Sequence, residues 1–219
     1  MVKITQLSSR EEWLENRKKY IGGSDAATVI GLNPYKNNVE LWEEKTGRVE
    51  AKDISEQPYV KYGHDAEEHL RTLFALDFRE KYAVGYIDNN SYYNDRFPWA
   101  AASLDGTLID KETDQRGILE IKTTNILQSM QKEKWKNGIP DNYFCQVLHY
   151  LAVTEFDFVV LKAQLKSVFG NGEVYLQTKH YRIERSDVES QIDYLMQKEK
   201  KFYQYIIDGT VPPLVLPVI

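Results

Sequence analysis

The stretch Trp99–Thr124, WAAASLDGTLIDKETDQRGILEIKTT, decides how the rest of this sequence is interpreted. It places Asp105 in a Ser-Leu-Asp-Gly turn, and after one loop comes the apolar run Gly-Ile-Leu-Glu-Ile-Lys. Strand residues two apart point to the same face, so Glu120 and Lys122 are expected to project together, with Ile121 on the opposite face. Two carboxylates and an ammonium are a minimal set of groups for holding a divalent metal ion and positioning a water for hydrolysis.

The same residues also have a purely structural interpretation. Asp105 is a common type of turn residue, and Glu120 with Lys122 could form an exposed ion pair on an edge strand. A pattern of one aspartate followed by Glu-x-Lys is short and common. The choice between the two interpretations therefore depends on the rest of the chain.

Secondary structure was predicted outward from this stretch. The expected helices cover residues 11–19, 26–30, 38–47, 60–76, 128–135, 142–154 and 186–208. The expected strands cover residues 82–87, 99–104, 107–109, 118–123, 156–165 and 173–182, and residues 88–94 are expected to form turns. This order predicts an α+β or mixed α/β fold, with a central mixed sheet flanked by helices, in a single domain spanning residues 1–219.

Three local details accompany this prediction. Trp13 and Leu14 are expected to point inward from the first helix. Ser24 or Asp25 is a natural N-cap for the second helix, and a Ser-Asp pair at residues 186–187 is expected to cap the last one.

Composition and charge exclude several classes of protein. The chain has 219 residues, 42% hydrophobic and 28% charged, and no apolar run reaches the roughly 18 residues of a membrane span. Residues 1–20 contain no secretory apolar core, so a cytoplasmic location is expected. A single cysteine, Cys145, excludes an internal disulfide and a four-cysteine metal or iron–sulfur site. The net charge of −5 argues against a DNA-coating protein, but not against an enzyme with a local basic channel.

Other polar residues fall at positions where they could join Asp105, Glu120 and Lys122. Gln146 and Tyr150 lie four apart and share one face of an apolar helix, and Glu67 lies on an acidic helix. Taken alone, Gln146 could be an ordinary helix glutamine and Glu67 part of a solvated face.

The turn at residues 22–24, Gly-Gly-Ser, is a candidate anion site. Backbone N–H groups at a helix start favour a phosphate, the Ser24 hydroxyl could join them, and Arg17 lies one helix away. For an isolated Gly-Gly-Ser turn, ordinary helix capping is the alternative.

Taken in order, these motifs resemble those of the phage lambda-type exonucleases, also called the YqaJ-like viral recombinases, in the PD-(D/E)xK nuclease superfamily. Arg17 and Ser24 resemble the family's pair for the 5′-terminal phosphate, and Glu67 resembles its helical carboxylate near the metal. The Ser-Leu-Asp-Gly turn resembles the family's Ser-Pro-Asp-Gly, with Leu104 where proline is usual. The remaining matches are the Glu-Ile-Lys strand at 120–122 and the Gln-x-x-x-Tyr motif of Gln146 and Tyr150.

The resemblance implies a restriction-endonuclease-like core and a set of site residues. Catalytic roles fall to Glu67, Asp105, Glu120, Lys122 and Gln146. Mg²⁺, for which Mn²⁺ would substitute, is expected at Asp105, Glu120 and Glu67 and at the Ile121 carbonyl. The 5′ phosphate and the DNA are expected at Arg17, Ser24, Ser103 and Tyr150.

The resemblance also implies an activity and its biological setting. The expected activity degrades one strand of a linear duplex from 5′ to 3′ and leaves a 3′ overhang for a single-strand annealing protein. A trimeric ring is expected, with Lys132, Lys134 and Lys136 lining a positive lumen, in a phage or prophage protein working in a bacterial cytoplasm without membrane association.

Two alternatives stay open at the level of sequence. One is a nuclease of the same superfamily with another polarity or substrate, although the single cysteine excludes its iron–sulfur versions. The other is an inactive derivative that binds DNA or protein.

Overall fold

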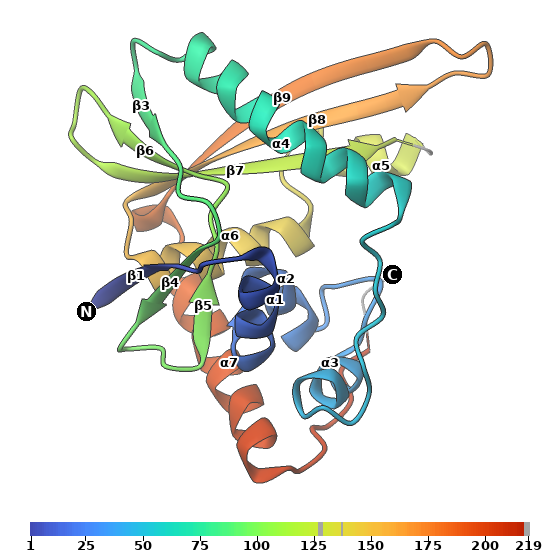
Figure 1. Ribbon diagram of the computed structural model, residues 1–219, viewed down its shortest axis with the longest axis vertical. Coiled ribbons are helices and arrows are strands. Elements are labelled where there is room, and N and C mark those ends of the chain that lie inside the picture. Colours follow the sequence, from blue (N-terminus) through green and yellow to red (C-terminus); the bar gives the residue numbers. More distant parts are fainter. Residues whose placement is uncertain (127–128, 137, 217–219) are drawn as a thin grey trace.

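A computed structural model describes residues 1–126, 129–136 and 138–216, and these contain seven α-helices and nine β-strands (Figure 1). The larger of two sheets has the strand order β3-β6-β7-β8-β9. Only the central pair, β7 with β8, is parallel, so the sheet is mixed. Its strands are β3 (Tyr82–Gly85), β6 (Gly106–Asp110), β7 (Arg116–Asn125), β8 (Phe158–Val168) and β9 (Val174–Glu184).

The central strand β7 is covered by helices on both faces, as its alternating apolar residues require. Leu119 and Ile121 belong to a buried cluster with helix α4 (Pro58–Asp77), through Leu70 and Phe74. Ile118 belongs to the larger cluster on the other face, which contains helix α6 (Asp141–Thr154). The prediction that Ile121 faces away from Glu120 and Lys122 follows from the same alternation and is confirmed.

The smaller sheet has the order β1-β4-β5-β2 and is also mixed, because β2 pairs with β5 in parallel. Its strands are β1 (Val2–Gln6), β2 (Ile21–Gly22), β4 (Asn90–Asn94) and β5 (Ala100–Ala102). The prediction of turns throughout residues 88–94 is wrong for β4. Asn90 and Asn94 are buried there because their amide groups bond to the backbone, Asn90 to Leu104 and Asn94 to Val153.

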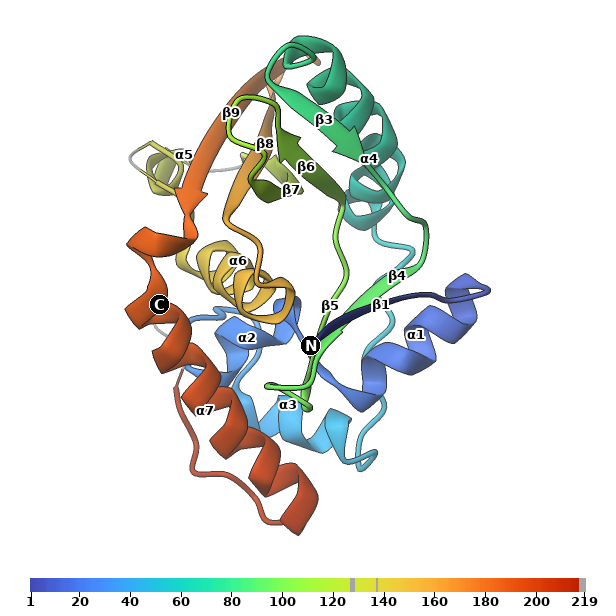
Figure 2. The ribbon, with the colours of Figure 1, turned by 90° about the vertical axis from the view of Figure 1, so that its left-hand side faces the viewer.

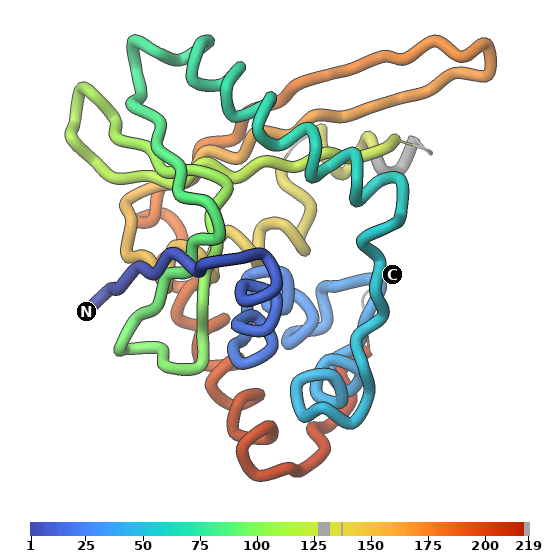
Figure 3. The backbone as a smooth tube through the Cα atoms, viewed as in Figure 1, coloured from blue at the N-terminus to red at the C-terminus, as the bar shows by residue number. Residues whose placement is uncertain are grey.

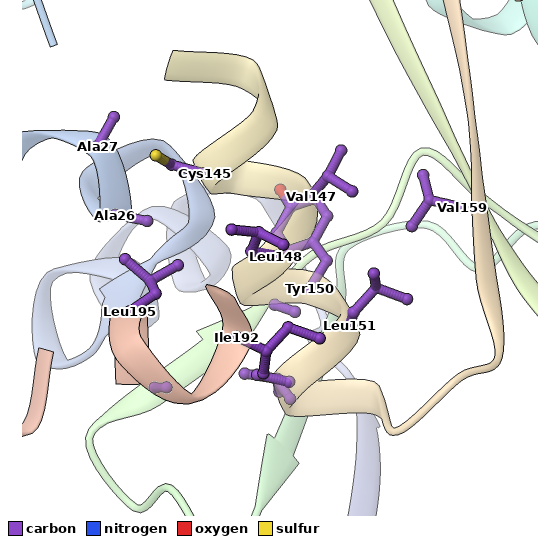
Figure 4. Close-up of a cluster of buried hydrophobic side chains, with 14 of the residues drawn as sticks. Ala26, Ala27, Cys145, Val147, Leu148, Tyr150, Leu151, Val159, Ile192 and Leu195 are labelled. Atoms are coloured by element: carbon purple, nitrogen blue, oxygen red, sulfur yellow. The ribbon is translucent and has the colours of Figure 1, made fainter. Parts of the chain in front are cut away.

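Helix α6 forms the centre of the molecule, and Figure 4 shows the apolar side chains packed around it. Every residue from Cys145 to Thr154 is buried. Ala26 and Ala27 of α2 (Gly23–Val29) and Ile192 and Leu195 of α7 (Glu189–Asp208) belong to the same cluster. Figure 2 shows the five-stranded sheet above α6 and the long helix α7 along the outside of the lower half.

Helix α2 approaches α6 so closely that Gly23 has no room for a side chain. A Cβ atom there would clash with the ring of Tyr150 and lie 2.9 Å from Cγ of Gln146. This contact brings the start of α2, with Ser24, next to the Gln-x-x-x-Tyr motif.

The remaining helices are α1 (Arg10–Lys19), α3 (Asn38–Lys45) and α5 (Ser129–Lys134). Trp13 is buried as predicted, but Leu14 is 47% exposed. Trp13 is the one buried residue of the short helix α1, because no other element of the described chain packs against the side that carries Leu14. Gln128, included in a predicted helix, lies outside the described residues.

Two predicted caps are wrong. Helix α2 has Gly22 as its N-cap, and the Asp25 side chain accepts a hydrogen bond from the Gly22 amide at 3.0 Å. Residues Arg185–Asp187 form a 3₁₀ turn, and α7 begins after Val188 without a side-chain cap.

The predicted α+β class with a mixed sheet between helices is confirmed, and the structure adds the second sheet. The backbone trace in Figure 3 also shows the β8–β9 hairpin extending beyond the rest of the chain. In the described part of the chain, no helix is long and apolar enough to cross a membrane.

Candidate active site

A cleft of about 820 Å³ opens between α1, α4, α6 and the segment around β5. Its lining gathers residues that the sequence scatters over 130 positions. Ile121 does not line the cleft, because its side chain packs on the opposite face of β7 under α4. The other predicted site residues all line it: Arg17, Ser24, Glu67, Ser103, Asp105, Glu120, Lys122, Gln146 and Tyr150.

Glu120 and Lys122 form an ion pair at the floor of this cleft. The Lys122 Nζ atom lies 2.6 Å from Oε1 of Glu120, which is only 1% exposed. Burial and the nearby Asp105 carboxylate raise the pKa of Glu120 to about 8. Burial disfavours the Lys122 ammonium, but the carboxylates of Glu120 and Asp105 outweigh it and raise the Lys122 pKa. The ammonium therefore stays charged.

Asp105 is tied to the strand that carries Glu120 and Lys122. Its Oδ2 atom accepts a hydrogen bond from the backbone N–H of Ile121 at 2.7 Å. Burial and the Glu67 carboxylate raise the pKa of Asp105 to about 7, against the opposing effect of Lys122. The turn and the strand quoted at the outset thus bring their charged groups together; the spacing predicted this for Glu120 and Lys122, and the family resemblance implied it for Asp105.

Glu67 reaches the same cleft from α4, but it is held by an arginine that the sequence analysis missed. Arg71 Nη1 lies 3.2 Å from Glu67 Oε1 and donates to the Asp105 backbone carbonyl at 2.7 Å. Its guanidinium also covers the Tyr86 ring, 3.6 Å from the centroid. Burial raises the pKa of Glu67 although Arg71 lowers it. The i, i+4 spacing of Glu67 and Arg71 was a usable signal for this pair.

The chemistry of this cluster fits a hard divalent cation. Glu120 Oε2 is buried and has no hydrogen-bond partner among the described residues, which is costly unless a ligand uses it. Burial raises the pKa values of Asp105 and Glu120, and a neighbouring carboxylate raises each further, so a bound cation would stabilise both in their charged forms. In the described ranges, no three His, Cys, Asp or Glu side chains are grouped to hold an ion by themselves. An ion that retains waters and takes substrate oxygens, as Mg²⁺ does, matches such a set.

Gln146 and Tyr150 share one face of α6, as their spacing predicted, and both line the cleft. Gln146 Nε2 donates to the Tyr150 hydroxyl oxygen at 2.8 Å. Burial and the Glu120 carboxylate raise the pKa of Tyr150, so the phenol stays neutral. The pair is thus a fixed, uncharged polar surface beside the acidic cluster.

Arg17 and Ser24 meet on the other side of the cleft. Arg17 Nη2 donates to Ser24 Oγ at 2.8 Å, which joins α1 to the start of α2. Lys45 of α3 supports this junction by bonding the backbone carbonyls of Arg17 at 3.1 Å and Tyr20 at 2.6 Å. The predicted pair is therefore formed before any ligand arrives.

Ser103 is engaged by a network that the sequence did not suggest. Trp13 Nε1 donates to Ser103 Oγ at 3.0 Å and lies 3.2 Å from the Asn90 carbonyl. The Asn90 amide holds Leu104 at both its N–H and its carbonyl, each at 2.8 Å. Asn90 thereby fixes the turn that carries Asp105, and no local signal in residues 88–94 indicated this.

Comparison with known proteins gives this arrangement a family. Residues 12–157 match the family described as the YqaJ-like viral recombinase domain. The chain is 31% identical over 212 residues to the uncharacterized protein YqaJ of Bacillus subtilis (strain 168), covering 94% of this chain. It spans 59% of the length of that relative.

Solved structures share the fold. An alkaline exonuclease from Laribacter hongkongensis matches with a TM-score of 0.65 at 19% identity, over 91% of this chain and 93% of that one. A phage related exonuclease from Haemophilus somnus 129PT matches with a TM-score of 0.55 at 12% identity, over 87% and 96%. The fold is that of phage-type exonucleases, and the chain belongs to the YqaJ-like viral recombinase domain family.

Proposed function

We propose that this family member is a divalent-metal-dependent deoxyribonuclease that digests linear duplex DNA from its 5′ ends. One observation carries the proposal: the Arg17–Ser24 pair and the cluster of Asp105, Glu120 and Lys122 open onto one cleft. The first group suits a terminal phosphate and the second suits phosphodiester hydrolysis. The exonucleases named above have the same fold, which supports this choice among nucleases.

Each side chain of the cleft takes a role that fits its position. Asp105 and Glu120, with the Ile121 carbonyl, offer oxygen ligands, and Glu67 can add its carboxylate if it leaves Arg71. Mg²⁺ or Mn²⁺ bound there supplies positive charge that polarises the scissile phosphate and makes a water more acidic. Lys122, held by Glu120, orients the attacking water and stabilises developing negative charge. Gln146 and Tyr150 position the nucleotide beside them.

Polarity follows from which end is anchored. With the 5′ phosphate at Arg17 and Ser24, and Ser103 nearby, the next phosphodiester along the strand reaches the acidic cluster. Removal of that strand leaves a 3′ overhang, which we expect a single-strand annealing protein to receive.

The biological setting is part of the same proposal. The family's description as a viral recombinase supports a phage or prophage origin and action in the cytoplasm of a bacterial host. We propose a trimeric ring around the DNA. Three lysines are exposed outside the cleft, on and just after α5: Lys132, Lys134 and Lys136. In such a ring they would line the central channel and contact the DNA phosphates.

The test is digestion of 3′-labelled linear duplex with a 5′ phosphate or a 5′ hydroxyl, in Mg²⁺, Mn²⁺ or EDTA. Phosphorylated ends should be digested with either metal and not in EDTA. Hydroxyl ends should be digested at least tenfold more slowly, since a charged contact to phosphate is lost.

Arg17→Gln should remove the preference for phosphorylated ends, whereas Lys18→Gln on the same helix should keep it. Lys18 is paired with Glu15 away from the cleft and serves as the matched control. Digestion from 3′ ends, or equal rates on both 5′ ends, would indicate a nuclease of another polarity or substrate. No cleavage with either metal would indicate an inactive binding protein.

A further inference from the structure

Arg10 is a second arginine of the cleft, and the function proposed above gives it no role. It lies seven residues before Arg17 on α1, and both guanidinium groups stack on one indole ring. The guanidinium carbons lie 4.0 Å and 4.5 Å from the Trp13 ring centroid, for Arg10 and Arg17 respectively. Trp13 is buried and its Nε1 atom is hydrogen-bonded, so the ring is a fixed platform for two cations.

Neither guanidinium forms an ion pair with a carboxylate in the described part of the chain. Among the described residues, no carboxylate lies within 4.0 Å of either guanidinium. Burial and the charge of Arg17 lower the pKa of Arg10, as expected for two like charges held close together. Such an arrangement is unfavourable in the free protein and becomes favourable when anions bind to it.

The surroundings of Arg10 place it between the two groups of residues already described. Its electrostatic neighbours are Arg17 on its own helix and Glu67, Tyr86 and Asp88 from other segments, and all of them line the cleft. Arg10 therefore lies within electrostatic reach of both Arg17 and Glu67, which belong to the two groups that the proposed strand contacts. The two guanidinium carbons cannot be farther apart than the sum of their distances to the shared ring centroid. That sum is on the scale of one nucleotide repeat.

We propose that Arg10 binds the first internucleotide phosphate, which is the linkage that the proposed function presents to the acidic cluster, in the strand whose terminal phosphate lies at Arg17 and Ser24. The proposal rests on the proposed function for the identity of the strand. A guanidinium has a planar set of N–H donors that matches phosphate oxygens. Stacking on Trp13 holds the Arg10 guanidinium in place, so no carboxylate is needed to orient it. The cleft thus grips two successive phosphates, and only the first is the end group.

The test separates the two phosphates by chemical substitution. Binding of Arg10→Gln and the unchanged protein is measured by fluorescence anisotropy in Ca²⁺, with three duplexes. One carries a 5′ phosphate, one a 5′ hydroxyl, and one a 5′ phosphate with an uncharged methylphosphonate at the first linkage. Glutamine removes the charge of Arg10 and keeps a polar side chain, and Lys18→Gln removes an equal charge from the same helix outside the cleft.

Arg10→Gln should weaken binding about tenfold for both the phosphate and the hydroxyl end, because the lost contact is not to the terminal group. It should also reduce the slope of log affinity against log salt by about one contact. With the methylphosphonate duplex, the variant and the unchanged protein should bind equally. Lys18→Gln should match the unchanged protein throughout.

Three results would overturn the assignment of Arg10. These are an unchanged affinity and salt slope in Arg10→Gln, a loss confined to 5′-phosphorylated ends, or a full loss that persists with the methylphosphonate. Circular dichroism and melting of each variant show that it is folded. Digestion by the unchanged protein in Mg²⁺ is scored separately, so a protein that cleaves without the expected Arg10 pattern rejects this inference alone. A protein that shows the pattern without cleavage rejects only the nuclease proposal.

Discussion

Two buried acid–base clusters lie on either side of α6 and have opposite characters. In the cleft, Glu120 pairs with Lys122 at 2.6 Å. Behind the cleft, Glu199 of α7 pairs with His149 Nδ1 at 2.8 Å, and His149 Nε2 bonds the Ala101 carbonyl at 3.0 Å. In both clusters one carboxylate oxygen, Oε2, is buried without a partner among the described residues.

The difference lies in charge balance and access. Both ring nitrogens of His149 contact acceptor oxygens. Burial lowers the pKa of His149, but the Glu199 carboxylate opposes burial and the pKa is raised on balance, so a cation is paired with an anion in a closed space. In the cleft, the three carboxylates of Glu120, Asp105 and Glu67 meet two cations, the Lys122 ammonium and the Arg71 guanidinium that pairs with Glu67, and the group opens to solvent. A buried ion pair by itself is therefore evidence of a structural role and not of a binding site. Excess like charge beside an open cleft indicates a place for a ligand.

The largest expected effect is a loss of cleavage on replacement of Lys122 but not of Lys162, a second lysine of the same sheet. Lys122→Met should lower cleavage in Mg²⁺ by about a thousandfold or more, because the water and the developing charge lose their ammonium. The fold should persist, since Glu120 can retain a proton when its partner is gone. Initial rates on a phosphorylated duplex measure the effect.

Lys162 is the control for Lys122, because it is a still more deeply buried lysine of the same sheet that lies on β8 opposite Ile121, over the Phe74 ring. Lys162→Met should keep cleavage within a few-fold of the unchanged protein. Equal losses in the two variants would mean that Lys122 acts through the fold and has no part in hydrolysis.

The second effect concerns the closed pair. His149→Gln should lower the free energy of unfolding by about 3–5 kcal/mol, because it leaves Glu199 buried without a cation. The raised pKa of His149 sets the sign of the pH dependence. Its contribution is complete below the ordinary histidine pKa and is lost as pH rises through the folded-state value.

Urea unfolding of His149→Gln at several pH values measures this contribution. The double variant His149→Gln, Glu199→Gln should recover most of the stability, since it removes both charges. A single variant as stable as the unchanged protein would show that the pair is not ionised.

The smallest effect has the opposite sign. Asp105→Asn should raise the free energy of unfolding at pH 8 in EDTA by about 1–2 kcal/mol, because it removes one of the crowded carboxylates. The pKa values of Asp105 and Glu120, about 7 and about 8 when folded, exceed their ordinary 3.8 and 4.5. The folded chain therefore binds protons more tightly, and its stability falls as pH rises through this range.

Asp110 provides the control with reversed sign. It is buried and paired with Arg182 at 2.8 Å, and hydrogen bonding by Arg182 lowers its pKa. Asp110→Asn should therefore destabilise the protein at pH 8, whereas Asp105→Asn stabilises it and abolishes cleavage. Thermal melts in EDTA from pH 5 to pH 9 compare the two, and destabilisation by Asp105→Asn would contradict the charge-crowding account.

The sequence predicted what depends on local periodicity. Glu120, Lys122 and Ile121 alternate on one strand, and Gln146 and Tyr150 share one helical face, so short-range geometry was sufficient. The gathering of these residues with Arg17 and Ser24 in one cleft followed from the family resemblance and could not be read from spacing.

What the sequence missed depends on contacts between distant segments. Asn90 is of a residue type common in turns, yet it lies in a strand because its side-chain amide bonds both the N–H and the carbonyl of Leu104. Leu14 is exposed because no element covers its side of α1. The ion pair of His149 and Glu199 joins residues 50 positions apart, and neither carries a local sign of the other.

The pairing of the smaller sheet has a consequence for the newly made chain. Val2 pairs with Asn94 and Ile21 with Ala100, so the earliest strands have no partner until the chain has been made as far as β4 and β5. Strand β7, which carries Glu120 and Lys122, in turn awaits β8. Long loops must close before such pairings stabilise anything, which makes folding late and concerted. In a chain still on the ribosome, Arg17 and Glu67 therefore stay apart from Glu120 and Lys122, and the proposed active site is assembled only once these pairings form.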